Sequence, residues 1–323
     1  MIDKFGRKID YLRISVTENC NLKCIYCIDE NNILNSCNND ILTDDEIVKI
    51  ATECARLGIK KIRITGGEPL VRKNIESLIY KLKCINGIEE IYITTNGVLL
   101  HTKIEDLKKN GLTGVNISLD SLNKDRFKKL TKFDKLQDVL LSIDKALELG
   151  LKVKINTVIV DDINKDEIID FVNLTKDKNL DIRFIELMPI GVGKVYKGVS
   201  NQEIRDLIKD NFNNIIEIGK EKSSGPAKYI KVDDALGKVG FISAMSNCFC
   251  EECNRVRITP EGFLKQCLHF DYGISLRDLI RKGISDQDLK IKIEETIYNK
   301  PEKHLFNQNK EHEEIRFMNQ IGG

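Results

Sequence analysis

The sequence predicts an α/β fold built on a parallel sheet, and two observations carry this prediction. From about residue 10 to residue 189, short apolar runs alternate with amphipathic stretches of helical periodicity. Such alternation is typical of parallel strands joined by right-handed helical crossovers. The length of 323 residues is ample for one large α/β domain with a smaller appended region. A partial barrel and a doubly wound sheet both satisfy this pattern.

The strands and helices of this region follow one another in regular order. We expect strands at residues 11–16, 61–65, 90–95, 114–120, 152–160 and 181–188. The first helix is expected to end at Leu57, because Thr43-Asp44-Asp45-Glu46 forms a capping box that opens it and Gly58 stops it. Further helices are expected at residues 74–83, 103–109, 135–149 and 165–178.

Each expected strand has one apolar and one polar face, because side chains alternate along a strand. Arg13, Arg63 and Lys154 all fall on the polar faces. If the helices cover the apolar faces, these three cations line a shared interior and need an anionic ligand there. The alternative is a half-exposed antiparallel sheet, which the intervening helices argue against.

The sequence pattern changes after Pro189. Residues 190–200 are typical of a linker or extended loop, and a short helix is expected near residues 202–209. A turn at 223–226, strands at 228–232 and 238–242 and an amphipathic helix beyond about residue 285 follow. We therefore expect two parts, residues 1–190 and residues 191–323.

Charge and hydropathy exclude several classes of protein. The chain has 51 Lys and Arg residues against 50 Asp and Glu residues, which argues against DNA or RNA as a partner. No apolar run approaches the roughly 18 residues of a membrane span, and the first eight residues lack the apolar segment of an export signal. We therefore expect a cytoplasmic protein without a membrane partner, in which cysteines stay reduced.

Six of the ten cysteines fall into two groups of three. Cys20, Cys24 and Cys27 form a C-x3-C-x2-C motif just after the first expected strand, and the second group is Cys250, Cys253 and Cys267. A closed structural zinc site needs four ligands. Three thiolates on a four-iron cluster leave one iron open to a non-protein ligand, which serves chemistry better than structure. A zinc-organised scaffold is the non-enzymatic alternative.

Two motifs resemble the radical S-adenosylmethionine (SAM) superfamily: the C-x3-C-x2-C triad and Gly66-Gly67-Glu68-Pro69 after the second expected strand. The run from Phe249 to Leu268 and the terminal Gly322-Gly323 are similar to the GTP 3′,8-cyclase family of molybdenum cofactor biosynthesis. This similarity covers nearly the whole chain. It implies a partial (βα)6 TIM-like barrel with a smaller C-terminal α+β region.

The resemblance also implies roles for individual residues. It implies one 4Fe-4S cluster that chelates SAM and a second 4Fe-4S cluster that anchors the guanine of GTP. The ligands of the two clusters would be Cys20, Cys24 and Cys27, then Cys250, Cys253 and Cys267. SAM would contact Tyr26, Gly67, Ser118 and Met188, and GTP would contact Arg13, Arg63, Thr94, Lys154, Arg255, Val256 and Arg257. Arg13, Gly322 and Gly323 would serve catalysis.

The family reaction implied here joins C3′ of the GTP ribose to C8 of its guanine, after a 5′-deoxyadenosyl radical abstracts the 3′ hydrogen. The implied partners are an electron donor such as flavodoxin or ferredoxin, the downstream cyclic pyranopterin monophosphate synthase, and a second copy in a homodimer. The chain departs from many relatives at Ile28-Asp29, where they have Met-Pro, and Cys248 is an additional thiol. A radical SAM peptide-modifying enzyme with an auxiliary cluster is the alternative enzyme class.

Overall fold

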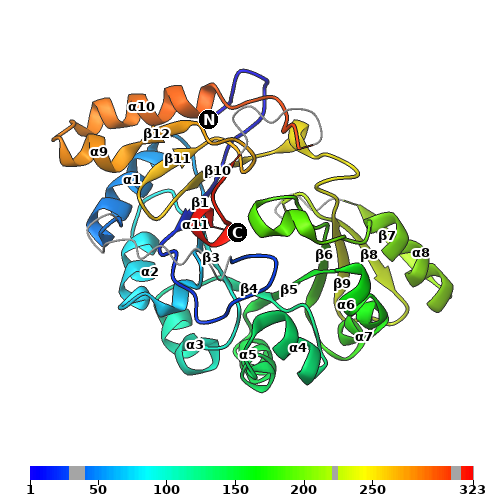
Figure 1. Ribbon diagram of the computed structural model, residues 1–323. Helices are drawn as coiled ribbons and strands as arrows, with labels where there is room; N and C mark the ends of the chain where they lie inside the picture. Colours follow the sequence, from blue (N-terminus) through cyan, green and yellow to red (C-terminus); the bar gives the residue numbers. More distant parts are fainter. Residues whose placement is uncertain (29–40, 220–224, 307–313, 323) are drawn as a thin grey trace.

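The computed structural model describes residues 1–28, 41–219, 225–306 and 314–322. Within these residues, one twelve-stranded sheet has the order β12-β11-β10-β1-β2-β3-β4-β5-β6-β9-β8-β7. The first six strands are mutually parallel. In Figure 1 they follow an arc with helices along its outer side. This arrangement confirms the predicted α/β fold and selects the partial barrel over the doubly wound sheet.

The barrel elements match the expected order. The strands are β1 (Tyr11–Ser15), β2 (Lys61–Thr65), β3 (Glu90–Thr95), β4 (Gly114–Ser118), β5 (Lys152–Val158) and β6 (Asp181–Ile185). The helices are α1 (Asp44–Arg56), α2 (Ile75–Lys83), α3 (Leu100–Lys109), α4 (Lys124–Thr131), α5 (Leu136–Glu148), α6 (Asp161–Asn164) and α7 (Ile168–Asp177). Helix α4 was not predicted, because only Phe127, Leu130 and Thr131 of its eight residues are buried and its apolar pattern is weak.

Residues beyond 190 add to both edges of the sheet. They form α8 (Asn201–Asn211), β7 (Ile215–Gly219), β8 (Lys228–Val232), β9 (Lys238–Ile242), β10 (Arg255–Ile258), β11 (Phe263–Lys265), β12 (Gly273–Ser275), α9 (Leu276–Arg281), α10 (Asp286–Tyr298) and α11 (Met318–Ile321). Strand β9 pairs parallel with β6, and β10 pairs parallel with β1. The predicted α8, β8, β9 and α10 are confirmed. The sequence did not predict β7, α9 or the three- to four-residue strands β10–β12.

The two faces of the barrel strands differ as their alternation predicts. Leu12, Ile62, Ile91 and Ile155 are fully buried in the core cluster shared with the outer helices. The alternate residues face a cavity inside the arc. Across the described ranges, every helix is too short or too polar to cross a lipid bilayer.

The predicted capping box starts α1. The Thr43 hydroxyl accepts a hydrogen bond from the Glu46 amide at 3.2 Å, and the Glu46 carboxylate accepts one from the Thr43 amide at 2.8 Å. Both bonds satisfy amides that have no partner within the helix.

Replacing Thr43 by Ala removes the hydroxyl acceptor, and we expect a loss of about 1 kcal/mol in the free energy of unfolding. The Thr43→Ser variant keeps the acceptor and should stay near the parent value. Urea denaturation at equal iron content measures both variants. Equal stability of the Ala and Ser variants would show that the cap contributes nothing here.

Candidate active site

One cavity along the inner face of the barrel strands brings both cysteine triads together. Its lining includes residues that end β2, β3, β4, β5 and β6. It also includes all six cysteines of the two triads: Cys20, Cys24, Cys27, Cys250, Cys253 and Cys267. Within the described ranges every cysteine is a free thiol. The two groups that the sequence singled out therefore face a shared chamber.

The first triad follows β1 and fits a metal cluster. Burial raises the pKa of Cys20 to about 11 and that of Cys27 to about 12. Burial also raises the pKa of Cys24, and the neighbouring thiols of Cys27 and Cys20 add to this shift. Three half-buried thiols whose charges would repel one another need a cationic partner before they ionise, because a metal ligand must be a thiolate. These residues therefore suit a cluster bound by three thiolates.

The Gly66-Gly67-Glu68-Pro69 segment packs against the chain that leads to this triad. A Cβ atom on Gly66 would lie 2.6 Å from the Thr17 carbonyl oxygen, and one on Gly67 would lie 2.4 Å from that of Glu18. The family resemblance implied a contact between Gly67 and SAM. A side chain at either glycine would collide with the backbone of residues 17–19, which is why glycine is required here. Both glycines also line the cavity.

Glu68 joins the ends of two strands. Its buried carboxylate accepts hydrogen bonds from the amides of Leu70 and Asn96, at 3.0 and 2.7 Å, and from the Thr95 hydroxyl at 2.8 Å. Burial raises the pKa of Glu68 to about 7, against the opposing effect of these donors. The residue holds the β2 and β3 ends in place beneath the triad.

The four predicted SAM contacts all line the cavity: Tyr26, Gly67, Ser118 and Met188. The Tyr26 hydroxyl donates a hydrogen bond to the buried carboxylate of Asp120, beyond the end of β4. Asp120 also accepts from the Val158 amide at 2.8 Å. This network fixes the Tyr26 ring within the motif that contains Cys24 and Cys27. Asp29 lies outside the described residues.

The second triad lies in and after the short helix η5 (Cys250–Glu252) and beyond β11. Burial favours the neutral thiol of Cys253, but Arg255 and Lys300 outweigh it and lower the pKa of Cys253 to about 6. Burial, together with the Cys248 thiol, raises the pKa of Cys250 to about 12. One ligand is thus ionised at neutral pH, and the set suits a cluster as the first triad does.

Arginines cluster between the two triads. The strand register places Arg13 beside Arg257 of β10 and beside Arg63 of β2. Burial lowers the pKa of Arg257 to about 10, with Arg255 adding to the shift. Burial and Arg257 likewise lower the pKa of Arg13. Cations that oppose one another in a buried space favour an anionic ligand.

Two of the predicted GTP contacts are placed apart from this cluster. Lys154 donates hydrogen bonds to Asp181 at 2.8 Å and to the Tyr229 hydroxyl at 3.2 Å. It lines a neighbouring cavity, which shares Lys61, Arg63 and Arg183 with the cavity of the two triads. The Val256 side chain is fully buried in the core. Thr94 lines the cavity of the two triads, and its hydroxyl accepts a hydrogen bond from Arg63 at 3.3 Å.

Sequence analysis missed two cations that line both cavities, Lys61 and Arg183. The signal was available. Lys61 has the same strand parity as Arg63, and Arg183 alternates with the buried Ile182 and Phe184. The alternation of polar and apolar side chains, which placed Arg13 and Arg63 on the inner face, therefore predicts that Lys61 and Arg183 also face the interior.

The C-terminal segment reaches this chamber. Figure 1 shows α11 inside the arc of strands. Arg257 donates a hydrogen bond to the Gly322 carbonyl at 3.0 Å. A Cβ atom on Gly322 would lie 2.7 Å from the Thr65 hydroxyl, and its φ of +76° also favours glycine. Gly323 lies outside the described residues.

A buried ion pair anchors the start of this segment. Lys265 and Glu314 are both almost fully buried, and the ammonium donates a hydrogen bond to the carboxylate. The Glu314 amide donates to the His269 carbonyl at 2.7 Å, and Arg316 donates to the same carboxylate at 2.9 Å. Glu314 thus joins the final segment to β11 and to the loop that follows Cys267.

Two family models match the chain. The Radical SAM superfamily model matches residues 14–175, and the Molybdenum Cofactor Synthesis C model matches residues 180–306. The crystal structure of Streptococcus suis SuiB bound to precursor peptide SuiA has a TM-score of 0.65 at 16% identity. That comparison covers 92% of this chain and 66% of SuiB, just under two thirds of its length, and shows the fold alone. Fold and triad together define a radical SAM protein.

Curated relatives identify the family to which this chain belongs among radical SAM proteins. GTP 3′,8-cyclase of Clostridium perfringens (strain 13 / Type A) is 56% identical over 326 residues, covering 100% of both chains. The GTP 3′,8-cyclases of Clostridium botulinum (strain Hall) and Petrotoga mobilis are 48% and 46% identical, again over both full lengths. This chain belongs to the GTP 3′,8-cyclase family.

Replacing Glu314 by Ala leaves the Lys265 ammonium buried without its counter-ion, a change that typically costs about 3–5 kcal/mol. We expect the segment 314–322 to detach, which hydrogen exchange measured by mass spectrometry reports as faster amide exchange. Glu302→Ala, an exposed residue outside that segment, is the control.

The double variant Lys265→Met/Glu314→Leu replaces the ion pair by apolar packing and should restore slow exchange. Slow exchange of residues 314–322 in the Glu314→Ala chain itself would contradict the anchoring role.

Proposed function

We propose that this chain catalyses the SAM-dependent cyclisation of GTP to (8S)-3′,8-cyclo-7,8-dihydroguanosine 5′-triphosphate, the first step of molybdenum cofactor biosynthesis. The observation that carries the proposal is the shared chamber, in which two three-cysteine sites flank a row of arginines. Relatives named GTP 3′,8-cyclase, at up to 56% identity over the full length, support it.

Each triad would hold one 4Fe-4S cluster through its three thiolates. The first cluster, with SAM, supplies the one-electron chemistry that generates the carbon radical. Tyr26, Gly67, Ser118 and Met188 would hold SAM at the mouth of the barrel, where they line the cavity. The second cluster, on Cys250, Cys253 and Cys267, would have an iron free to bind the guanine of the substrate.

The arginines would bind the polyphosphate and hold the ribose between the clusters. Arg13, Arg63, Arg255 and Arg257 supply guanidinium groups that donate paired hydrogen bonds to phosphate oxygens. Thr94 would add a hydroxyl contact beside Arg63. Lys154 would join them from the neighbouring cavity, and Val256 would contact GTP through its backbone because its side chain is buried.

Arg13 and the terminal Gly322-Gly323 would act at the reacting nucleotide. Gly322 fills a space beside Ser15 and Thr65 that a larger residue would overfill, and Arg257 holds its carbonyl. We further propose a division of labour along the chain. Residues 1–190 would form the SAM-cleaving barrel, and residues 191–323 would contribute the second cluster and the glycine tail.

The wider setting follows from the same proposal. A reduced electron carrier such as flavodoxin or ferredoxin would supply the electron that cleaves SAM. Cyclic pyranopterin monophosphate synthase would consume the product. We propose a cytoplasmic location, where the thiols stay reduced, and a homodimer as the assembly.

Anaerobic turnover tests the proposal directly. With reductant, SAM and GTP, we expect 5′-deoxyadenosine and a cyclised nucleotide in equal amounts by mass spectrometry. Replacing Cys24 by Ala should abolish both products, because the first cluster loses a ligand. ATP is the control nucleotide.

Three results would reject the assignment. Formation of 5′-deoxyadenosine with a peptide but not with GTP would favour a peptide-modifying enzyme. Zinc without iron or acid-labile sulfide in anaerobically purified protein would favour the scaffold. Iron-loaded protein with no GTP turnover would also reject it.

Replacing Arg255 or Arg257 by Ala should weaken GTP binding by roughly 10- to 100-fold, the scale of a lost hydrogen bond to a charged group. Equilibrium binding measures this effect, and SAM affinity and the iron of the first cluster should change little. Arg281→Ala, whose guanidinium pairs with Glu46 far from the cavity, is the matched control. Equal losses of SAM and GTP binding would mean that these arginines are structural.

A further inference from the structure

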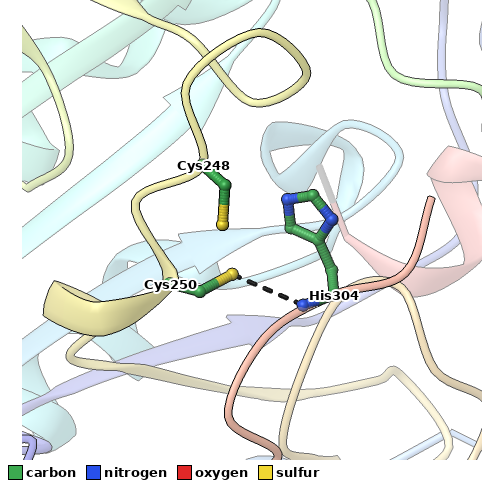
Figure 2. Close-up of side chains that lie close together, drawn as sticks. All are labelled: Cys248, Cys250 and His304. Atoms are coloured by element: carbon green, nitrogen blue, oxygen red, sulfur yellow. Dashed lines mark hydrogen bonds between the residues drawn. The ribbon is translucent and has the colours of Figure 1, made fainter. Parts of the chain in front are cut away.

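Three metal-ligating side chains gather beside the second triad, and the proposed function uses only one of them. The sulfurs of Cys248 and Cys250 and a ring nitrogen of His304 all lie within 4.8 Å of one another. Figure 2 shows the two cysteines on one segment and the imidazole of His304 facing them from another. Tetrahedral zinc with bonds of about 2.3 Å to sulfur holds two sulfurs roughly 3.8 Å apart. The two sulfurs therefore lie at most about 1 Å beyond that spacing.

The backbone holds the two segments together without a metal. The His304 amide donates a hydrogen bond to the Cys250 sulfur at 3.5 Å (Figure 2). Arg7 joins the same segments, because its buried guanidinium donates to the carbonyls of Cys250 at 2.9 Å, Glu302 at 2.8 Å and Pro301 at 2.7 Å. The three donor groups are therefore positioned before any ion binds.

The His304 ring is suited to metal binding. Both ring nitrogens are buried and lack a hydrogen-bond partner. Phe306 packs against the ring at 4.7 Å between centroids. Cys248 is exposed, which leaves an entry path from solvent.

We propose that Cys248, Cys250 and His304 bind one thiophilic divalent cation, with zinc as the probe, whenever the second cluster is absent. The two thiol protons leave to solvent on binding, no electron is transferred, and the fourth position is open to water. The proposal rests on the proposed function in one respect, since Cys250 also serves the second cluster. The cation and the second cluster are then alternative occupants of Cys250. A bound cation covers the exposed Cys248 thiol and prevents assembly of the second cluster, whose open iron would bind guanine.

A variant that assembles only the first cluster allows zinc binding at Cys248, Cys250 and His304 to be measured without competition from the second cluster. The Cys267→Ser variant is reconstituted with iron and sulfide, equilibrated with zinc chloride and desalted, and its zinc is then measured by elemental analysis. We expect one zinc per chain, with two sulfurs and one nitrogen in its X-ray absorption spectrum. Adding Cys248→Ser or His304→Gln should weaken zinc binding at least tenfold, and His304→Gln should remove the nitrogen signal. Cys84→Ser, at an exposed thiol elsewhere, should change nothing.

The outcomes separate this proposal from the proposed function. Zinc bound equally tightly without Cys248 or without His304 overturns the cation site, and so does a Cys267→Ser chain that binds no zinc. In the wild-type chain, zinc added first should reduce iron uptake by about half, because only the first of two four-iron clusters then forms. Failure of the fully iron-loaded wild type to convert GTP rejects the proposed function and leaves the zinc result unaffected.

Discussion

The pairing of β10 with β1 is the constraint on which the site depends. It joins segments more than 240 residues apart and sets Arg13 opposite Arg257, while β2 on the other side sets Arg63 opposite Arg13. Neighbouring strands lie about 4.8 Å apart, so one row of the sheet carries three guanidinium groups. The first triad follows β1 and the second precedes β10. Because the strands are parallel, the two triads lie on opposite sides of this row: the first beyond the carboxyl end of β1 and the second before the amino end of β10.

Most of the barrel could be predicted from local sequence patterns, because its strands and helices are periodic and have clear start and stop signals. The α1 capping box and the alternation in β1, β2 and β5 identified their structures directly. Alternation also turned Arg13 and Arg63 inward, and the cavity bears this out. The same rule placed Lys154 correctly by face. It could not show that Lys154 is held by Asp181 and the Tyr229 hydroxyl and lines the neighbouring cavity.

What the sequence could not supply was contact between distant segments. Arg255-Val256-Arg257-Ile258 alternates like a strand, yet four residues within a cysteine motif predict no partner. Lys265 of β11 pairs with Glu314, 49 residues further along the chain, and Cys248 meets His304 from a segment similarly distant in sequence. Family resemblance supplied the cluster ligands, because spacing identifies a triad without showing that two triads face the same chamber.

The arginine row has a consequence for the protein before it meets its ligand. Mutual repulsion in a buried space raises the free energy of the empty fold, and a bound polyanion relieves it. Ligand binding and folding are thereby linked, so the stability of the native state rises with the logarithm of the anion concentration once the anion exceeds its dissociation constant. Sulfate or pyrophosphate in a buffer would act as a weak occupant, raising the melting temperature while competing for the nucleotide pocket.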